Sequence, residues 1–165
     1  MRHKFTLLMS AAVLSVSAYA QDFTVGGIKY SVLSDAEKTC QLTDGKSVEG
    51  SLDIPASVKN GSSEYAVVKI GEMAFETDSL LTAVSVPSTV TDIDAFAFNK
   101  CKGLEKLTLG DNVATIGGSA FGECLLLESV DIPEKVDVLG SSLFKGCASL
   151  REVNFKGVVK TIGFS

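Results

Sequence analysis

Three cysteines in the second half of the chain recur at a constant interval. Cys101, Cys124 and Cys147 are 23 residues apart, and Cys40 is the only other cysteine. Thiols can bind metal ions, but no histidine or paired-cysteine motif accompanies these. Side chains that recur in one column of a repeat stack in parallel, which suits a disulfide poorly. We therefore expect small, buried, free thiols, with disulfides as the alternative that an oxidising compartment would permit.

Catalytic groups are sparse. The single histidine, His3, lies in an expected leader segment, so the remaining chain cannot build a Ser-His-Asp or Cys-His pair. Asp92 and Asp94 are the closest pair of carboxylates, but they flank the apolar Ile93 and are better explained as turn residues. No phosphate-binding, dinucleotide-binding or calcium-loop motif occurs. We expect no enzymatic activity, no cofactor and no metal site.

Residues 1–20 have the layout of a signal peptide. Residues 2–4 are basic, an apolar stretch follows, and residues 18–20, Ala-Tyr-Ala, fit a small-x-small cleavage site. The apolar stretch is too short to span a bilayer. We therefore predict export to the medium or the cell surface, cleavage before Gln21 and no membrane span after cleavage.

Removing this leader makes the chain more acidic. The full sequence has 15 basic and 20 acidic residues, so the loss of Arg2 and Lys4 leaves 13 basic residues, a net charge of −7, and Arg151 as the sole arginine. Such a surface repels phosphate backbones and anionic lipid headgroups. Neither nucleic acid nor a membrane surface is expected as a partner.

The elements that must position these residues are consecutive copies of a 23-residue unit. Four units begin at Ile70, Ile93, Ile116 and Leu139, and a fifth begins at Ile162. The same columns are apolar in every unit. The column five places after the opening residue holds Phe75, Phe98, Phe121 and Phe144. A fixed period of this length is typical of a solenoid, in which each coil is stable only when it is stacked on its neighbours.

Each coil is expected to contain one short strand and one short helical turn, which makes the fold class α/β. The pattern Leu-x-x-Val-x-Ile, residues 127–132 in the third unit, alternates apolar and polar side chains as a strand does. Pro133 then stops the strand ladder. Residues 118–124 space their apolar side chains for a single helical turn.

Residues 21–69 lack the full repeat and are predicted to form an N-terminal cap on the solenoid of residues 70–165. Alternating stretches around Gly26 and Gly27 predict a β-hairpin. Residues 52–55 match the strand columns of the later units, so a half coil is expected to begin at about Leu52.

A second hairpin and an unusual aspartate mark the start of the full repeats. Asn60-Gly61 between β-forming residues predicts a hairpin, with Tyr65 and Val67 covering the first coil. Asp78 occupies the column that holds cysteine in the next three units. An aspartate in place of cysteine indicates an environment more accessible to water at the N-terminal end of the solenoid.

The columns resemble the leucine-rich repeats of the BspA-like bacterial surface family, whose pattern is I-G-x-x-A-F-x-x-C-x-x-L-x-x-V-x-I-P-x-x-V. The third unit matches this pattern at Ile116, Gly117, Ala120, Phe121, Cys124, Leu127, Val130, Ile132, Pro133 and Val136. The match covers about Leu52 to Ser165, with departures at Leu143, Gly110 and Lys156. The resemblance implies a curved right-handed leucine-rich-repeat solenoid at the cell surface or in the medium. It also implies adhesion to host matrix proteins or to other cells.

A binding surface is the candidate functional site. Side chains on either side of the fourteenth-column residue point away from the core, and stacked strands form the concave sheet that solenoids use for partners. We predict partner binding by Lys106, Thr108, Glu128, Ser129, Asp131, Arg151, Glu152 and Asn154. The alternative is an ordinary solvated face, because these positions hold no aromatic residue, whereas tyrosine and tryptophan dominate binding hot spots.

The sequence thus predicts an exported, non-enzymatic protein-interaction module, adhesin-like, whose partner is a host-matrix or cell-surface protein or another bacterial surface protein. The alternative is a structural spacer, or a fragment of a larger surface protein, with no ligand of its own. The fifth unit stops at Ser165 without a cap, so the exposed edge of the fourth coil could also associate with another copy of the chain.

Overall fold

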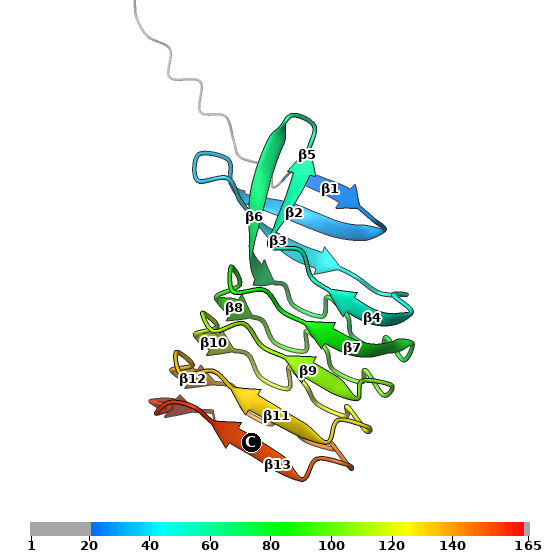
Figure 1. The fold of residues 1–165 in the computed structure, drawn as a ribbon, viewed down its shortest axis with the longest axis vertical. Helices are drawn as coiled ribbons and strands as arrows, with labels where there is room; N and C mark the ends of the chain where they lie inside the picture. The colour runs from blue at the N-terminus through cyan, green and yellow to red at the C-terminus, as the bar shows by residue number, and fades with distance from the viewer. Residues whose placement is uncertain (1–20, 164–165) are drawn as a thin grey trace, which may run out of the picture.

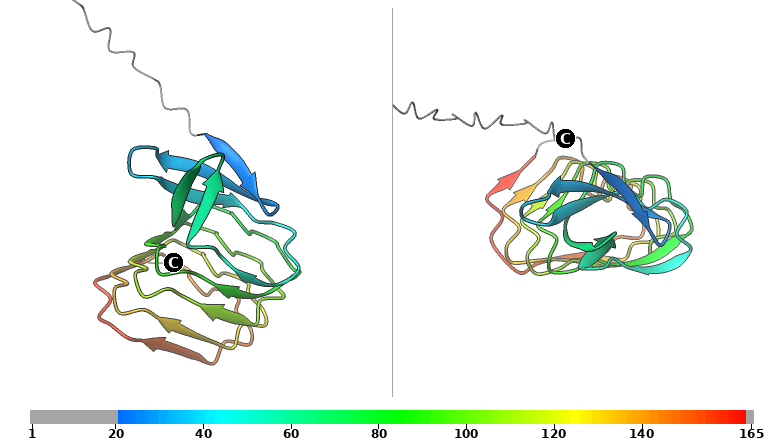
Figure 2. Two further views of the ribbon diagram at one scale, coloured as in Figure 1. Left: turned by 45° about the horizontal axis from the view of Figure 1, so that its top comes forward. Right: turned by 90° about the horizontal axis from the view of Figure 1, so that it is seen from above.

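The computed structural model describes residues 21–163. The expected signal peptide and residues 164–165 of the fifth unit lie outside the described residues. The described chain winds as a β-solenoid whose coils stack on one another, with the N-terminal strands gathered at one end (Figure 1). Viewed along the stack, the coils superpose around a shared interior (Figure 2).

Two rows of strands follow the two sides of each coil. One row belongs to a sheet ordered β1-β2-β3-β6-β8-β10-β12-β14, with β5 paired to β6. Its strands are β1 (Asp22–Val25), β2 (Ile28–Ser34), β3 (Thr39–Asp44), β5 (Ser57–Asn60), β6 (Ser63–Ile70), β8 (Asp92–Ile93), β10 (Thr115–Ile116), β12 (Val138–Leu139) and β14 (Thr161–Ile162). The other row comprises β4 (Gly50–Asp53), β7 (Leu81–Ser85), β9 (Lys106–Thr108), β11 (Ser129–Ile132) and β13 (Glu152–Phe155). Each coil therefore carries one strand in each row, whereas the sequence predicted only the strand of the second row.

The register of both rows follows the 23-residue period. In the first row Ile93 pairs with Ile116, which pairs with Leu139, always in parallel. In the second row Val84 lies opposite Leu107, one period further along the chain. Equivalent columns are therefore neighbours in space, as the repeat predicted.

The predicted helical turn is wrong, because the described residues contain no helix. After each opening residue the chain instead makes successive β-turns, each closed by a hydrogen bond between residues three positions apart. The Asp78 amide donates to the Phe75 carbonyl at 3.0 Å, but the Phe75 amide donates to Ala97 of the next coil at 2.8 Å. Met73 and Thr77 also have φ of 57° and 69°, and equivalent positions repeat this in later coils. An α-helix requires negative φ throughout and keeps its amides within the helix, so neither condition is met.

The core consists of stacked identical side chains. Ring centroids are 4.9 Å apart for Phe75 and Phe98, 5.7 Å for Phe98 and Phe121, and 5.9 Å for Phe121 and Phe144. The cysteines beside them are free, as expected. The thiol of Cys124 donates to the Phe98 carbonyl at 3.3 Å, and Cys101 and Cys147 make equivalent bonds. The thiols therefore help to hold successive coils together.

Two predicted hairpins are present at the N-terminal end. β1 and β2 pair antiparallel around Gly26 and Gly27, and β5 and β6 pair around Gly61. Tyr65 and Val67 on β6 are buried. β3 was not predicted: it lies parallel to β6. A strand of the first row therefore lies ahead of the first full coil.

The prediction that Asp78 lies in an environment more accessible to water is wrong. The Asp78 side chain is buried, and its carboxylate accepts hydrogen bonds from the Val48 and Leu80 amides, both at 3.1 Å. A thiol could not accept two such bonds equally well, since sulfur is a weak acceptor. The aspartate thus fastens the loop before β4 to the first coil.

Candidate functional site

The eight predicted binding residues all lie exposed on the outer side of the second row of strands, which we call the strand face. Ser129 and Asp131 of β11 lie opposite Glu152 and Asn154 of β13. On the neighbouring strands, Lys106 and Thr108 of β9 lie opposite Ala83 and Ser85 of β7. Glu128 and Arg151 directly precede β11 and β13. The structure therefore gathers the predicted residues on three successive strands.

The strand face is interrupted at one place, which we call the β9–β11 junction. β4, β7 and β9 form one sheet and β11 and β13 form another. Among the described residues, no backbone hydrogen bond joins β9 to β11. Backbone hydrogen bonds do join neighbouring coils on both sides of the junction. The Glu105 amide donates to the Thr82 carbonyl at 2.8 Å, and the Arg151 amide donates to the Glu128 carbonyl at 2.9 Å. The same two coils remain joined on their other side through β8 and β10.

The peptide groups that face the junction follow from the alternation along parallel strands. The Val86 amide donates to the Thr108 carbonyl at 2.9 Å, so Thr108 faces the coil before it. Adjacent residues of a strand direct their backbone groups to opposite sides. The backbone groups of Leu107 and Leu109 are therefore directed toward β11, and by the same argument those of Ser129 and Asp131 are directed toward β9.

Core side chains are more accessible beside the junction than elsewhere in the row. Leu107 and Leu109 are 9% and 8% exposed, compared with 3% for both Val84 and Val86 and 1% for both Val130 and Ile132. Two hollows lie over this part of the face, of about 350 and 210 Å³, and Ser129 lines both. The junction is therefore a shallow surface cleft and not a closed seam.

Both hollows mix charges of opposite sign. The larger is lined by Glu105, Lys106, Leu126, Glu128, Ser129 and Ser149. The smaller is lined by Leu107, Thr108, Leu109, Ser129, Asp131 and Lys156. Five predicted residues thus line the hollows, whereas Arg151, Glu152 and Asn154 do not. Sequence reasoning missed Leu126, Ser149 and Lys156 as lining residues, because neither their columns nor their types distinguish them from other surface positions.

Asp131 is the most connected polar side chain on the strand face. Its carboxylate accepts a hydrogen bond from the Asn154 amide at 3.2 Å and pairs with the Lys156 ammonium at 3.3 Å. The hydrogen bond from Asn154, with the contribution of Lys156, lowers the pKa of the Asp131 carboxyl. Asp131 therefore presents a fixed negative charge at the edge of the smaller hollow at neutral pH.

Potential metal ligands and thiols were the reactive groups that the sequence singled out. No group of three potential metal ligands occurs among them. Burial raises the pKa of the Cys40 thiol to about 11 and that of Cys101 to about 12, and it raises that of Cys124 further. The thiolate is the reactive form, so these cysteines are poor nucleophiles. Within residues 21–163 no helix is long and apolar enough to cross a membrane.

Comparison with known proteins identifies the repeat. The family model described as "BspA type Leucine rich repeat region" matches residues 56–165 in 6 copies. No curated protein matches the chain. Among solved structures, a leucine-rich repeat protein from Bacteroides capillosus is 34% identical, with a TM-score of 0.73, and the alignment covers 82% of this chain and 99% of that one.

Two further structures extend the comparison to longer proteins. A leucine rich cell surface protein from Faecalibacterium prausnitzii is 30% identical with a TM-score of 0.65, over 88% of this chain and 45% of that one. The pneumococcal vaccine antigen PcpA is 18% identical with a TM-score of 0.70, over 87% of this chain and 40% of that one. The second of these likenesses concerns the fold alone. In both cases the chain spans less than half of the other protein.

Proposed function

Because the chain belongs to the BspA type leucine-rich-repeat family, we propose that it is an exported, non-enzymatic module that binds a protein partner through the strand face. The observation that carries this proposal is the β9–β11 junction, where polar side chains and backbone groups surround two adjoining hollows. Solenoids commonly bind partners on stacked strands. A similar protein from Faecalibacterium prausnitzii is described as a cell surface protein, which supports a surface or secreted location.

The charge pattern indicates what kind of surface would fit. Lys106, Glu128 and Glu152 form no ion pair among the described residues. A partner that presents opposite charges in register would therefore gain contacts without breaking existing ones. Charged pairs of this exposed kind contribute to orientation and association rate more than to affinity. We propose an adhesin-like role, with a host-matrix or cell-surface protein as the partner.

The test reverses three charges on the strand face. The variant Lys106→Glu, Asp131→Lys, Glu152→Lys is compared with Glu72→Lys, Glu134→Lys, Lys135→Glu, which changes the net charge equally at exposed positions outside the strands. Binding is measured against immobilised extracellular-matrix proteins and a bacterial cell-wall protein fraction. Reversing a charge does more than remove a weak pair, because it places like charges against each other, which costs several kcal/mol. We therefore expect the first variant to lose roughly tenfold or more in affinity and the second to bind as the unmodified chain does.

Two results would count against the proposal. Equal binding by both variants would place the contact elsewhere, and binding to neither probe by the unmodified chain would favour the spacer alternative. Circular dichroism of both variants establishes that a loss of binding is not a loss of folding.

A further inference from the structure

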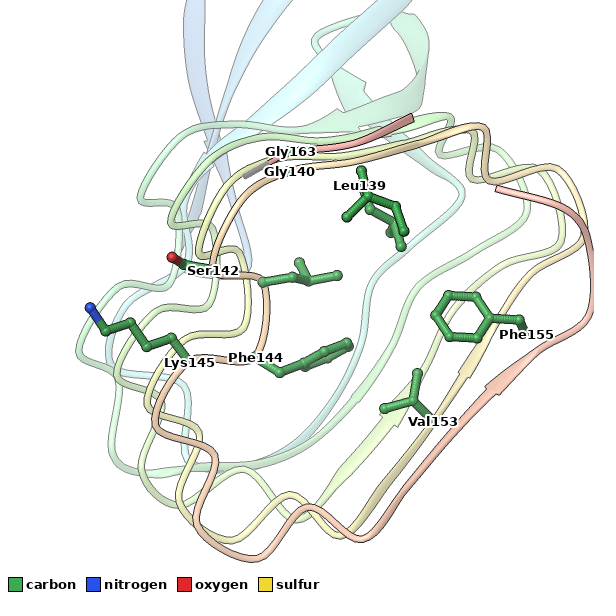
Figure 3. Close-up of a pocket in the computed structure, with 10 residues that line it drawn as sticks. Leu139, Gly140, Ser142, Phe144, Lys145, Val153, Phe155 and Gly163 are labelled. Carbon is green, nitrogen blue, oxygen red and sulfur yellow. The ribbon is translucent and has the colours of Figure 1, made fainter. Parts of the chain in front are cut away.

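The hollows on the described surface differ in their lining. The hollow at the last coil, of about 700 Å³, is lined mainly by apolar side chains, and Phe144, Val153 and Phe155 are directed into it (Figure 3). It lies where the described residues end, so it carries no inference about a ligand. The larger hollow at the β9–β11 junction, of about 350 Å³, is lined by six residues between positions 105 and 149, and three of them are charged. All of its lining residues belong to complete coils.

The two hollows at this junction also differ in their charge balance. In the smaller hollow Asp131 and Lys156 form an ion pair at 3.3 Å. In the larger hollow Glu105, Lys106 and Glu128 form no ion pair among the described residues. Two carboxylates against one ammonium leave one negative charge without a counterpart. A cation from a partner would therefore neutralise the lining of the larger hollow, whereas the smaller hollow is already neutral.

Leu126 adds an apolar surface to the larger hollow. Its side chain is 46% exposed and lines the hollow. The equivalent position one coil earlier is Gly103, where a Cβ would lie 2.4 Å from the Ser79 carbonyl oxygen, so no side chain from that position covers Leu126. Apolar surface beside unpaired charges suits a long basic side chain, whose methylene stem packs on the apolar part while its charged end reaches the polar groups.

Backbone carbonyls provide further acceptors at the junction. The peptide groups of Leu107 and Ser129 are directed into it and make no hydrogen bond across it among the described residues. A guanidinium carries five donors in a planar fork, so it can reach carboxylate and carbonyl oxygens together, whereas an ammonium is a compact and strongly hydrated point charge. The mixture of acceptors therefore favours arginine over lysine.

The size of the hollow and the charge of the chain limit the kind of ligand. A volume of about 350 Å³ lies at the lower end of the range of ligand pockets, about 300–1,000 Å³. A shallow site of this size suits one side chain of a larger partner. The chain has a formal net charge of −5, which favours the approach of a basic partner.

We propose that the larger hollow receives an arginine side chain from a basic segment of the protein partner. The guanidinium lies between the carboxylates of Glu105 and Glu128, and the methylene stem lies along Leu126. This inference rests on the proposed function, because it takes the strand face as the contact surface, and it adds the residue type that the partner contributes.

Short peptides test the hollow directly. The probes are glycine-flanked peptides with blocked ends and a central arginine, lysine or citrulline, and citrulline has nearly the shape of arginine but no charge. Amide NMR spectra of the chain are recorded during each titration. We expect the arginine peptide to give saturable shifts of the Leu126 and Ser129 amides, the lysine peptide to bind more weakly, and the citrulline peptide to give no saturable shift.

Paired variants assign the binding to the two carboxylates. An exposed ion pair contributes up to about fivefold in affinity, so Glu105→Gln, Glu128→Gln should weaken arginine binding by roughly fivefold or more. The matched control Glu72→Gln, Glu134→Gln removes the same charge at exposed positions outside the strands and should leave binding unchanged. Leu126→Ala removes the support for the stem and should weaken the arginine and lysine peptides alike. The same spectra show whether each variant is folded.

Equal binding of the arginine and citrulline peptides would overturn this inference, as would a folded Glu105→Gln, Glu128→Gln variant that binds arginine as tightly as its control does. If the charge-reversal variant of the strand face still loses binding to the protein probes, the proposed function stands without the arginine contact. Selective arginine binding by a chain that binds none of the protein probes would instead support the hollow as an arginine site and count against the proposed function.

Discussion

The two ends of the solenoid contain similar apolar columns in opposite situations. At the N-terminal end Leu42, Val67 and Phe75 are fully buried, whereas at the C-terminal end Phe155 and Ile162 are largely exposed. The difference comes from neighbouring structure and not from residue type. A coil supplies one half of an apolar interface, and the next coil or a cap must supply the other.

The N-terminal end is closed by a loop as well as by hairpins. The Gly45 amide donates to the Ala74 carbonyl at 2.8 Å, and a Cβ added at Gly45 would lie 2.1 Å from the Phe75 ring. The absence of a side chain at Gly45 therefore lets the loop lie directly on the first phenylalanine of the stack. Asp78 fixes the same loop through the Val48 amide. The last phenylalanine, Phe144, is only partly buried.

The largest expected effect contrasts the middle of the phenylalanine stack with its open end. Phe98→Ala removes a ring packed between two others and should cost about 3–5 kcal/mol of unfolding free energy. Phe144→Ala removes a ring that is already partly exposed and should cost about 1–2 kcal/mol. Urea denaturation measures both. Equal losses would contradict the difference between interior and end.

The next effect concerns the attachment of the N-terminal loop. Asp78→Ala leaves the Val48 and Leu80 amides without their acceptor and should cost about 1–3 kcal/mol. Amide exchange at Val48 should accelerate more than exchange at Phe98 in the core. Unchanged protection of Val48 would mean that the carboxylate does not fasten the loop. Asp78→Asn keeps one acceptor oxygen, so its unfolding free energy should lie between those of the unmodified chain and Asp78→Ala.

Alkaline pH should loosen the N-terminal end. Burial raises the pKa of the Cys40 thiol from 9.0 to about 11, and burial, with a contribution from Cys40, raises the pKa of Tyr30 from 10.0 to about 12. A raised folded pKa gives stability that is complete below the unfolded pKa and is lost as pH rises through the folded one. Stability should therefore fall from about pH 9 upward, by about 1 kcal/mol for Cys40 at pH 10. Denaturant melts of Cys40→Ala between pH 7 and pH 11 should show a smaller loss, and an identical loss would exclude Cys40 as a cause.

The smallest expected effects come from exposed ion pairs at either end. Lys29 and Asp44 lie 2.9 Å apart in the N-terminal cap, and Lys160 and Asp137 lie 2.8 Å apart in the last coils. Lys29→Ala and Lys160→Ala should each change stability by less than about 1 kcal/mol, because water screens both pairs. Thermal melts in low and high salt would reveal any larger contribution, which would argue against apolar stacking as the source of stability.

The repeat made much of the fold predictable. A constant interval between apolar residues determines which side chains become neighbours, so the phenylalanine stack, the free cysteines and the strand register followed from the sequence. The turn after each opening residue did not. Its apolar spacing fits a helix, but hydrogen bonds to the next coil and positive φ at residues such as Met73 decide otherwise. Those contacts connect residues 22 or more positions apart along the chain and leave no local signature.

The candidate site was predictable only in part. Alternation along a strand identifies outward side chains, and all eight predicted residues are exposed on the strand face. The break between β9 and β11 was not predicted, because the second and third units keep the same apolar columns. Asp78 shows the same limit: its type indicated contact with water, whereas two backbone amides in a buried site bind it instead.

Hydrogen–deuterium exchange, read residue by residue, tests the contrast between the two ends most directly. The Val67 amide, which donates to the Ala56 carbonyl at 2.9 Å inside the N-terminal cap, should exchange slowly. The Val153 and Phe155 amides, which have no hydrogen-bond partner among the described residues, should exchange fast. Equally slow exchange at Val67 and Val153 would contradict the difference between the two ends.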